Sequence, residues 1–223
     1  MLRRTALASL AAFAFLGSRS ARADENATEN PTVALTFDDG PHPELTPRLL
    51  DILEREQISA TFFVIGSCAA HRPDIVRRAF DAGHEIGNHT WSHPVLTRVS
   101  LAQAAEEISR TDALLKDLTG SIPNTLRPPY GAMNNNLSEL TLPRPLMLWD
   151  VDTLDWKTRN TLAVERAATE SDGGIVLFHD IHPTTVEAIP AIIRNFKSRG
   201  YHFVTISSYV TWEVTDPSWL DRA

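Results

Sequence analysis

The chain alternates short apolar runs with longer segments of helical period, and this alternation limits its possible folds more than any other feature. The short runs favour β-strands, while the longer segments repeat their apolar residues every three or four positions, as helices with one buried face do. Strands that alternate with helices pair in parallel, because each helix returns the chain to the start of the next strand. The expected strands are 33–37, 60–65, 84–89, 125–127, 146–149, 174–178 and 202–205. The expected helices are 44–56, 73–82, 100–120, 160–171 and 184–199.

About seven strand–helix units predict an α/β fold, a distorted (β/α) barrel of about seven parallel strands with crossover helices. That number of units favours a barrel over an open sheet. The length suffices for one domain with its own core and is too short for two. We expect this domain to cover residues 31–210, after a polar N-terminal tail over 24–30 and before a C-terminal tail over 211–223.

The first 23 residues have the pattern of a secretory signal peptide. Two arginines precede an apolar core over 7–17, and Ala21-Arg22-Ala23 fits a cleavage site of the A-x-A type. The apolar core is shorter than the roughly 20 residues of a membrane-spanning helix. We therefore expect a signal peptide over 1–23 and a secreted or periplasmic protein without a membrane anchor.

The charge balance restricts the partners. The whole chain has a formal net charge of −7, and removal of the expected signal peptide, which has four arginines and no acid, would make it −11. Such a charge disfavours nucleic acid and anionic lipid as partners. The chain has one cysteine and therefore no internal disulfide, and nothing in the sequence indicates a protein partner.

Polar residues follow the expected strands directly. Asp38 and Asp39, His89, Arg127, the acids between 150 and 155, and His179 each come after an apolar run. In a (β/α) barrel the carboxyl ends of all strands meet on one face, where active sites form. The sequence therefore predicts one polar site made from these strand ends.

Two of these groups predict a metal site. Asp38 and Asp39 are adjacent like charges that need a cation or another partner, although a simple Asp-Gly turn is the alternative. His89 and His93 are spaced so that a helix or a tight turn directs both imidazoles toward one point. One carboxylate of the Asp pair would complete a two-histidine, one-carboxylate site with open positions for water and substrate.

Three further segments suggest other roles. Arg127 begins a rigid Arg-Pro-Pro-Tyr-Gly segment and would suit a bidentate clamp on a carboxylate, although a structural loop would explain the prolines. Trp149 and Trp156 flank three acids, which suits a sugar ring, and core packing explains Trp149 equally well. His179 ends a strand and could act as a general acid.

Five ordered motifs in this chain resemble those of the NodB-like polysaccharide deacetylases, carbohydrate esterase family four. They are Thr36-Phe-Asp-Asp-Gly40, His89-Thr-Trp-Ser-His93, Arg127-Pro-Pro-Tyr130, Asp152-Thr-Leu-Asp-Trp156 and Leu177-Phe-His179. The resemblance spans residues 31–210 and implies that this domain is a catalytic domain of the NodB homology type. It also implies a distorted (β/α) barrel, in agreement with the pattern of strands and helices.

The resemblance also implies roles for individual residues. Asp39, His89 and His93 would bind one divalent metal ion, usually zinc, with cobalt or nickel as alternatives. Asp38 would be the catalytic base, oriented by Arg127.

For the other motifs, His179 would be the catalytic acid, tuned by Asp155. The backbone N–H of Tyr130 would help to hold the oxyanion. Trp156 and Leu177 would line the pocket for the acetyl methyl group.

We therefore predict a metal-dependent hydrolase that removes acetyl groups from polysaccharide or oligosaccharide containing N-acetylglucosamine, of the peptidoglycan or chitin type, and releases acetate. An O-acetyl esterase acting on xylan through the same site is the alternative enzyme. A non-catalytic carbohydrate-binding relic of the fold is disfavoured, because a relic would have lost a metal ligand or the base. An acetylated glycan is the expected binding partner.

Overall fold

The computed structural model describes residues 31–215, and the side chains of residues 31–210. The expected signal peptide over 1–23 and polar tail over 24–30 lie outside the described residues, as do residues 216–223. Helix α9 (Ile206–Thr215) crosses the expected domain boundary at residue 210.

Strand β1 (Thr32–Asp38) lies at the centre of the sheet, and every residue after its first is buried. It pairs in parallel with β2 (Thr61–Val64), with β5 (Gly174–His179) and, through its first two residues, with β6 (His202–Phe203). Its apolar and partly β-branched sequence suits a parallel strand that is covered on both faces.

The strands follow one another around the sheet in the order β3-β2-β1-β5-β4, with β3 at Glu85–Asn88 and β4 at Val151–Asp152. Single parallel bridges join Asn88 to Leu126 and Leu126 to Leu146. The segment that contains Leu146 and β4 therefore pairs with Leu126 at one end and with β5 at the other. This segment closes the ring, so the predicted distorted (β/α) barrel is confirmed.

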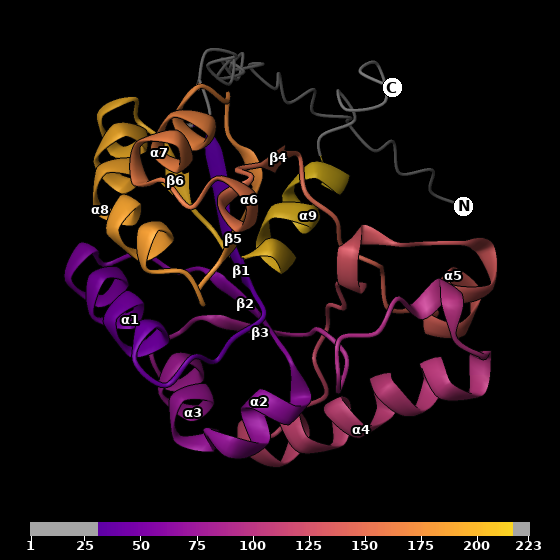
Figure 1. Ribbon diagram of the computed structural model, residues 1–223. Helices are drawn as coiled ribbons and strands as arrows, with labels where there is room; N and C mark the ends of the chain where they lie inside the picture. The colour runs from indigo at the N-terminus through magenta and orange to yellow at the C-terminus, as the bar shows by residue number, and fades with distance from the viewer. Residues whose placement is uncertain (1–30, 216–223) are drawn as a thin grey trace, which may run out of the picture.

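Eight helices and two short 3-10 helices accompany α9 within residues 31–215. They are α1 (Leu45–Glu56), α2 (Gly66–His71), α3 (Pro73–Asp81), α4 (Leu101–Thr119), α5 (Asn135–Thr141), α6 (Asp155–Thr158), α7 (Thr161–Thr169), α8 (Pro183–Ser198), η1 (Leu96–Arg98) and η2 (Pro129–Gly131). Around the outside of the sheet α7 packs on α8, α8 on α1, α1 on α3, α3 on α4 and α4 on α5 (Figure 1). Helix α9 contacts β1 from the other side.

The alternation of side chains along each strand separates two buried layers. In β1, Val33, Leu35 and Phe37 belong to the large core between the sheet and the outer helices, whereas Ala34 belongs to a smaller cluster inside the barrel. The same alternation directs Asp38, at the carboxyl end of β1, toward the interior of the barrel. The period of the strand thus places a charged side chain where the strand ends meet.

Two predicted strands, 125–127 and 146–149, are wrong as strands, because only the single bridges at Leu126 and Leu146 form there. Pro145 directly precedes Leu146, and Pro128 lies two positions after Leu126. A proline cannot donate a ladder hydrogen bond. Helices α2, α5, α6 and α9, strand β4 and the two 3-10 helices were not predicted from the sequence.

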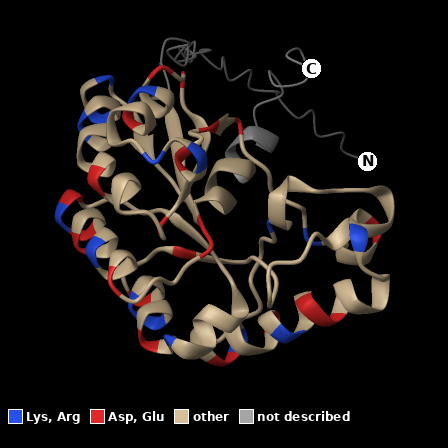
Figure 2. Ribbon diagram, in the orientation of Figure 1, with Lys and Arg blue, Asp and Glu red and all other residues tan. Residues whose placement is uncertain are grey.

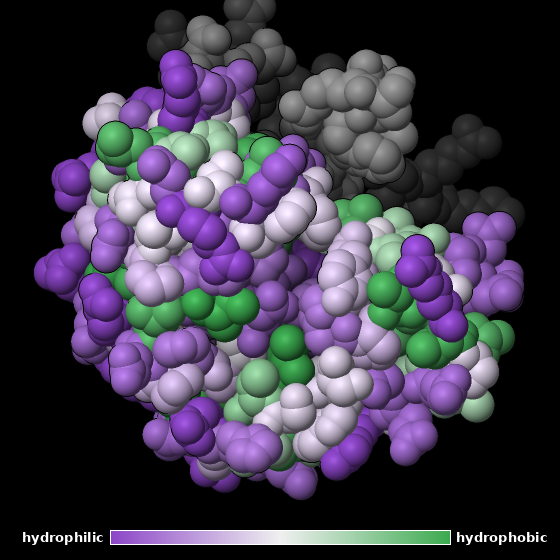
Figure 3. All heavy atoms as spheres, viewed as in Figure 1, coloured by the Kyte–Doolittle hydropathy of each residue, from purple (hydrophilic) through white to green (hydrophobic). Residues whose placement is uncertain are grey.

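Charged residues lie mainly on the outer helices, with a few acidic positions near the centre of the barrel (Figure 2). The face in Figure 3 is largely hydrophilic, with small separate hydrophobic areas. Among residues 31–215, no helix combines the length and the apolar character needed to cross a bilayer.

Candidate active site

A cavity of about 440 Å³ lies where β1, β3 and β5 end. It is lined by Asp38, Asp39, His89, His93, Tyr130, Trp149, Asp152, Trp156, Leu177 and His179. The structure thus brings together all the predicted site residues except Arg127 and Asp155. These two are fully buried and contact Asp38 and His179 from behind.

Three of the lining residues form a group that fits a metal ion. Oδ1 of Asp39 lies 3.5 Å from Nε2 of His89 and 3.3 Å from Nε2 of His93. One possible ligand atom from each residue lies within 4.8 Å of the others. Oδ1 of Asp39 is buried and has no hydrogen-bond partner among the described residues. A buried, unpaired carboxylate oxygen beside two imidazole nitrogens is a donor set that suits a divalent cation.

The orientation of His89 supports this interpretation. Its Nδ1 lies 2.8 Å from the backbone oxygen of Arg127, so Nδ1–H donates to that carbonyl and Nε2 is left to face Asp39. Burial lowers the pKa of His93. Burial alone would raise the pKa of Asp39, but the contact with His89 and the other nearby imidazoles hold that pKa below its ordinary value. Both shifts favour the protonation states that bind a cation, namely a neutral imidazole and an ionised carboxylate.

Asp38 is held by a buried ion pair. Nη1 of Arg127 donates to Oδ1 of Asp38 at 2.8 Å and to the hydroxyl of Thr36 at 2.8 Å. Oδ2 of Asp38 points toward the histidines and lies 3.7 Å from Nε2 of His89. The ion pair therefore uses one carboxylate oxygen and leaves the other at the cavity.

His179 is oriented by Asp155. Nδ1 of His179 lies 2.8 Å from Oδ1 of Asp155, whose second oxygen accepts the backbone N–H of His179 and the hydroxyl of Thr185. Burial acts to lower the pKa of His179, but the hydrogen bond to Asp155 and its charge outweigh burial and raise the pKa to about 9. The imidazole is therefore protonated at neutral pH, and Nε2 is the nitrogen left for a molecule in the cavity.

Aromatic side chains form the open wall of the cavity. Tyr130 is 68% exposed and Trp156 is 48% exposed, whereas Leu177 is buried at the base. The ring of Tyr130 lies edge-on to His93, with 4.7 Å between the ring centroids. Exposed aromatic rings beside polar groups suit the binding of a sugar.

Sequence reasoning gave Asp152 and Asp180 no individual role in the site, and it left Trp149 open between sugar binding and core packing. Trp149 and Asp152 line the cavity, and their position in the acid-rich segment between the two tryptophans was a usable signal. Asp180 does not line the cavity and is fully buried, and this burial raises its pKa to about 7. Its carboxylate accepts the hydroxyl of Thr46 and occupies the space that a Cβ on Gly40 would need. No sequence signal indicates that contact, because Thr46 and Asp180 are far apart in the chain.

The fold and the site together define a class of protein: a distorted (β/α) barrel with a carboxylate–histidine group at the carboxyl ends of its strands. The chain belongs to the polysaccharide deacetylase family. The family model described as "Polysaccharide deacetylase" matches residues 25–142, which is more than half of the chain.

Individual relatives agree with this membership. A peptidoglycan-N-acetylglucosamine deacetylase of Listeria monocytogenes, PgdA, is 45% identical over 182 residues, which make up 81% of this chain and 39% of that protein. A chitooligosaccharide deacetylase of a Bradyrhizobium species is 33% identical over 189 residues, covering 76% of this chain and 86% of that protein. The matched part of this chain therefore spans well under half the length of PgdA.

Solved structures give the same result. The structure of the peptidoglycan deacetylase PdaC from Bacillus subtilis matches with a TM-score of 0.80 at 38% identity. The match covers 87% of this chain and 97% of that chain.

Proposed function

We propose that this chain is a metal-dependent hydrolase that removes acetyl groups from polysaccharide or oligosaccharide containing N-acetylglucosamine and releases acetate. The main observation behind the proposal is that Asp38 and His179 end neighbouring strands in register, beside the group of Asp39, His89 and His93. Family membership and the activities of PgdA and the Bradyrhizobium protein support the same reaction.

Asp39, His89 and His93 would hold one divalent ion, and we propose zinc, with cobalt or nickel as alternatives. The donor set of two imidazoles and one carboxylate suits these metals. When bound, the ion would supply Lewis-acid polarisation of the acetyl carbonyl and a lowered pKa of water.

Asp38 would act as the general base that takes a proton from the attacking water. Arg127 fixes its carboxylate by the bond to Oδ1, so the free Oδ2 is the oxygen that can accept the proton. The backbone N–H of Tyr130 would help to hold the oxyanion of the tetrahedral intermediate.

His179 would donate the proton that the departing amine needs. An amine is a poor leaving group unless it is protonated, and the raised pKa of His179 supplies a protonated imidazole. Nε2 would give its proton to the nitrogen as the carbon–nitrogen bond breaks, so that acetate and a free amine result. Trp156 and Leu177 would enclose the acetyl methyl group at the cavity wall.

We propose that the substrate is a wall-type or chitin-type glycan outside the cytoplasm. The arginines, apolar core and A-x-A site over residues 1–23 support export of the chain to a secreted or periplasmic location. The domain over 31–210 would then be the catalytic unit. Residues 24–30 and 211–223 would be the tails before and after it. PgdA is a deacetylase of peptidoglycan, and the Bradyrhizobium protein is a deacetylase of chitooligosaccharide.

Acetate release tests this proposal. We expect the purified protein to release acetate from chitooligosaccharides or peptidoglycan, to lose this activity with a dipicolinate-type chelator, and to regain it with added zinc. Acetylated xylan is the comparison substrate. Acetate from xylan alone would favour the O-acetyl esterase, and full activity in metal-free protein would exclude the metal-dependent mechanism.

A further inference from the structure

The loop that contains both histidines has an unusual backbone. Thr90 has a φ of 67° and His93 a φ of 61°, which is the left-handed region that residues with a side chain rarely adopt. Such conformations persist only where the surrounding structure specifies them. The contacts that hold the loop from 88 to 93 therefore decide where the two imidazoles point.

Helix α4 supplies one such contact directly. Oε2 of Glu107 accepts the backbone N–H of Trp91 at 2.9 Å and of Ser92 at 2.7 Å, and its Oε1 accepts the hydroxyl of Ser92 at 2.7 Å. One turn further along the helix, Arg110 lies over the ring of Trp91, 3.6 Å from its centroid. A single carboxylate thus satisfies the N–H groups of the two residues between Thr90 and His93. Charge-assisted bonds of this kind are stronger than bonds between neutral groups.

A second carboxylate of α4 acts through a buried amide. Nδ2 of Asn88 donates to Oδ1 of Asp112 at 2.7 Å, and Oδ1 of Asn88 accepts the backbone N–H of Thr90 at 2.7 Å. Asn88 is completely buried, so its amide has a fixed orientation. It connects Asp112 to the left-handed residue that directly follows His89.

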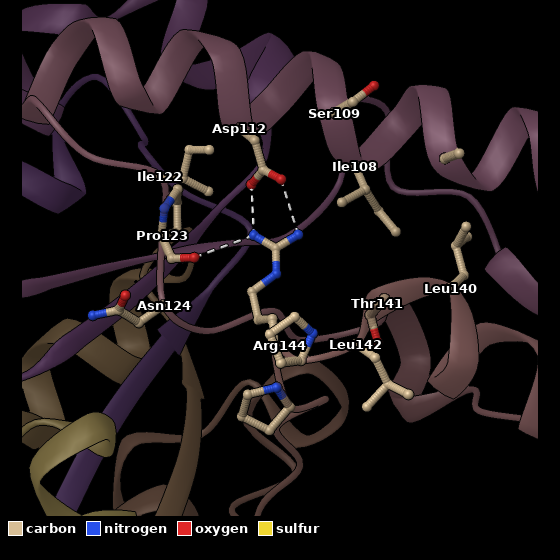
Figure 4. Close-up of a pocket in the computed structure, with 13 residues that line it drawn as sticks. Ile108, Ser109, Asp112, Ile122, Pro123, Asn124, Leu140, Thr141, Leu142 and Arg144 are labelled. Carbon is tan, nitrogen blue, oxygen red and sulfur yellow. Dashed lines mark hydrogen bonds and ion pairs between the residues drawn. The ribbon is translucent and has the colours of Figure 1, made fainter.

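Arg144 holds Asp112 in place from the opposite side. It makes two bonds to the carboxylate, at 2.7 and 2.9 Å, and a third to the backbone oxygen of Pro123 at 3.2 Å (Figure 4). This pair lies in a separate pocket between α4 and the segment after α5, where exposed apolar side chains such as Ile122 and Leu142 surround it. The carboxylate of Asp112 is therefore shared between the wall of this outer pocket and the loop of the two histidines.

We propose that Glu107 and Asp112 are positioning residues that hold His89 and His93 in the geometry for binding the metal ion, Glu107 by direct contact with the two loop residues before His93 and Asp112 through Asn88. This inference rests on the proposed metal-dependent function. Neither carboxylate touches the cavity, and both lie on α4, whose start is fixed by a capping box of Ser100 and Gln103. The helix thus acts as a rigid support for a strained loop.

The decisive comparison is between Glu107→Gln and Glu106→Gln. Both variants remove one charge from neighbouring positions of α4, but the exposed side chain of Glu106 makes no hydrogen bond or ion pair with the loop among the described residues, whereas Glu107 makes three hydrogen bonds to it. The metal-free proteins are titrated with Co²⁺, which reports affinity and, through its visible spectrum, the ligand geometry. We expect Glu107→Gln to bind about 10- to 100-fold more weakly with an altered spectrum, as loss of outer contacts to metal ligands does. Glu106→Gln should match the wild type.

Asp112 is tested by a graded pair. Asp112→Asn keeps an oxygen that can accept the Asn88 amide, whereas Asp112→Ala removes it. We expect the Asn variant to bind Co²⁺ more tightly than the Ala variant, and thermal unfolding of both metal-free proteins separates this effect from a general loss of stability. If Glu107→Gln does not fold, Ser92→Ala replaces it, because it removes only one bond to Glu107 and should weaken affinity by about threefold to tenfold.

The outcomes separate the two proposals. If the wild type binds Co²⁺ and releases acetate while Glu107→Gln (or, in its place, Ser92→Ala) and Asp112→Ala bind it equally well, the positioning role is wrong and the proposed function stands. If the wild type has no affinity for Co²⁺ or Zn²⁺, both are wrong.

Discussion

Asp38 and Asp39 are adjacent, yet they have different surroundings because the backbone changes between them. Asp38 is the last residue of β1 and points into the barrel by the alternation of the strand. The same alternation would direct Asp39 to the outer layer. A φ of 75° at Asp39 turns its side chain back toward His89 and His93 instead. The left-handed residue therefore places two consecutive carboxylates at one site.

We expect Asp38→Asn and Asp39→Asn to have separable effects. Asp38→Asn should keep the metal and reduce acetate release by about 100-fold or more, because an amide cannot accept the proton of water. Asp39→Asn should weaken the metal itself, because it removes the only anionic ligand of the group. Metal content by elemental analysis and acetate release check both. Loss of metal in the Asp38 variant alone would show that the two roles are exchanged.

Asp155 should determine the alkaline limit of activity. His179 must be protonated to act as an acid, so activity falls as pH rises through its pKa, which Asp155 holds at about 9. Asp155→Asn removes the charge that raises this pKa, and the alkaline limb of the pH–rate profile should move toward the ordinary value of about 6.5. Metal content should not change. An unmoved limb would mean that another group supplies the proton.

At the scale of the elements, the accuracy of prediction followed the strength of the local signals. Helix α4 has a Ser at its start, a regular apolar face and Gly120 at its end, and the structure agrees with the prediction within a residue. Helix α6 has four residues and is flanked by Leu154 and Arg159, both with positive φ, so no periodic pattern exists to find it. The strands expected around 126 and 146 failed because strand propensity says nothing about whether a neighbour pairs along their length.

The cap of α4 gives a prediction at this scale. Ser100→Ala removes the side-chain acceptor of the N–H of Gln103 and should lower the free energy of unfolding by about 1 kcal/mol. Ser109→Ala, at an exposed position in the same helix, is the control and should be neutral or slightly stabilising, because alanine is the better helix former. Urea denaturation measures both. Equal stabilities would mean that the packing of α4, and not its cap, fixes its start.

At the scale of the whole molecule, the site was more predictable than its support. The residues that line the cavity follow apolar strands, and the barrel topology alone implies that they meet. The distinction between Asp38 and Asp39, in contrast, came from resemblance to a family, since spacing treats them alike. Glu107, Asp112 and Asp180 could not be predicted, because their contacts depend on how helices pack on the barrel.

The closure of the barrel rests on one side chain as much as on the backbone. A single bridge joins Leu126 to Leu146, so few backbone hydrogen bonds connect residues 126–127 with residues 146–148. We call this weakly paired part of the barrel the seam, and Arg127 lies across it. Its Nε and Nη2 donate to the backbone oxygens of Met147 and Leu148 at 3.3 and 2.9 Å, so the guanidinium replaces missing rungs of the ladder.

Arg127 thus has a proposed role in catalysis, through Asp38, and a structural role between residues 126–127 and 147–148. Arg127→Lys separates the two, because an ammonium group can still pair with Asp38 but cannot reproduce the planar fork that spans the seam. We expect the amide proton of Met147 to exchange faster with solvent in this variant, while amides within β1 and β5 keep their protection. Native-state hydrogen exchange reads this directly, and unchanged exchange at Met147 would mean that the seam holds without the arginine. In this chain, the side chain proposed to orient the catalytic base therefore also joins the part of the barrel where the backbone ladder is incomplete.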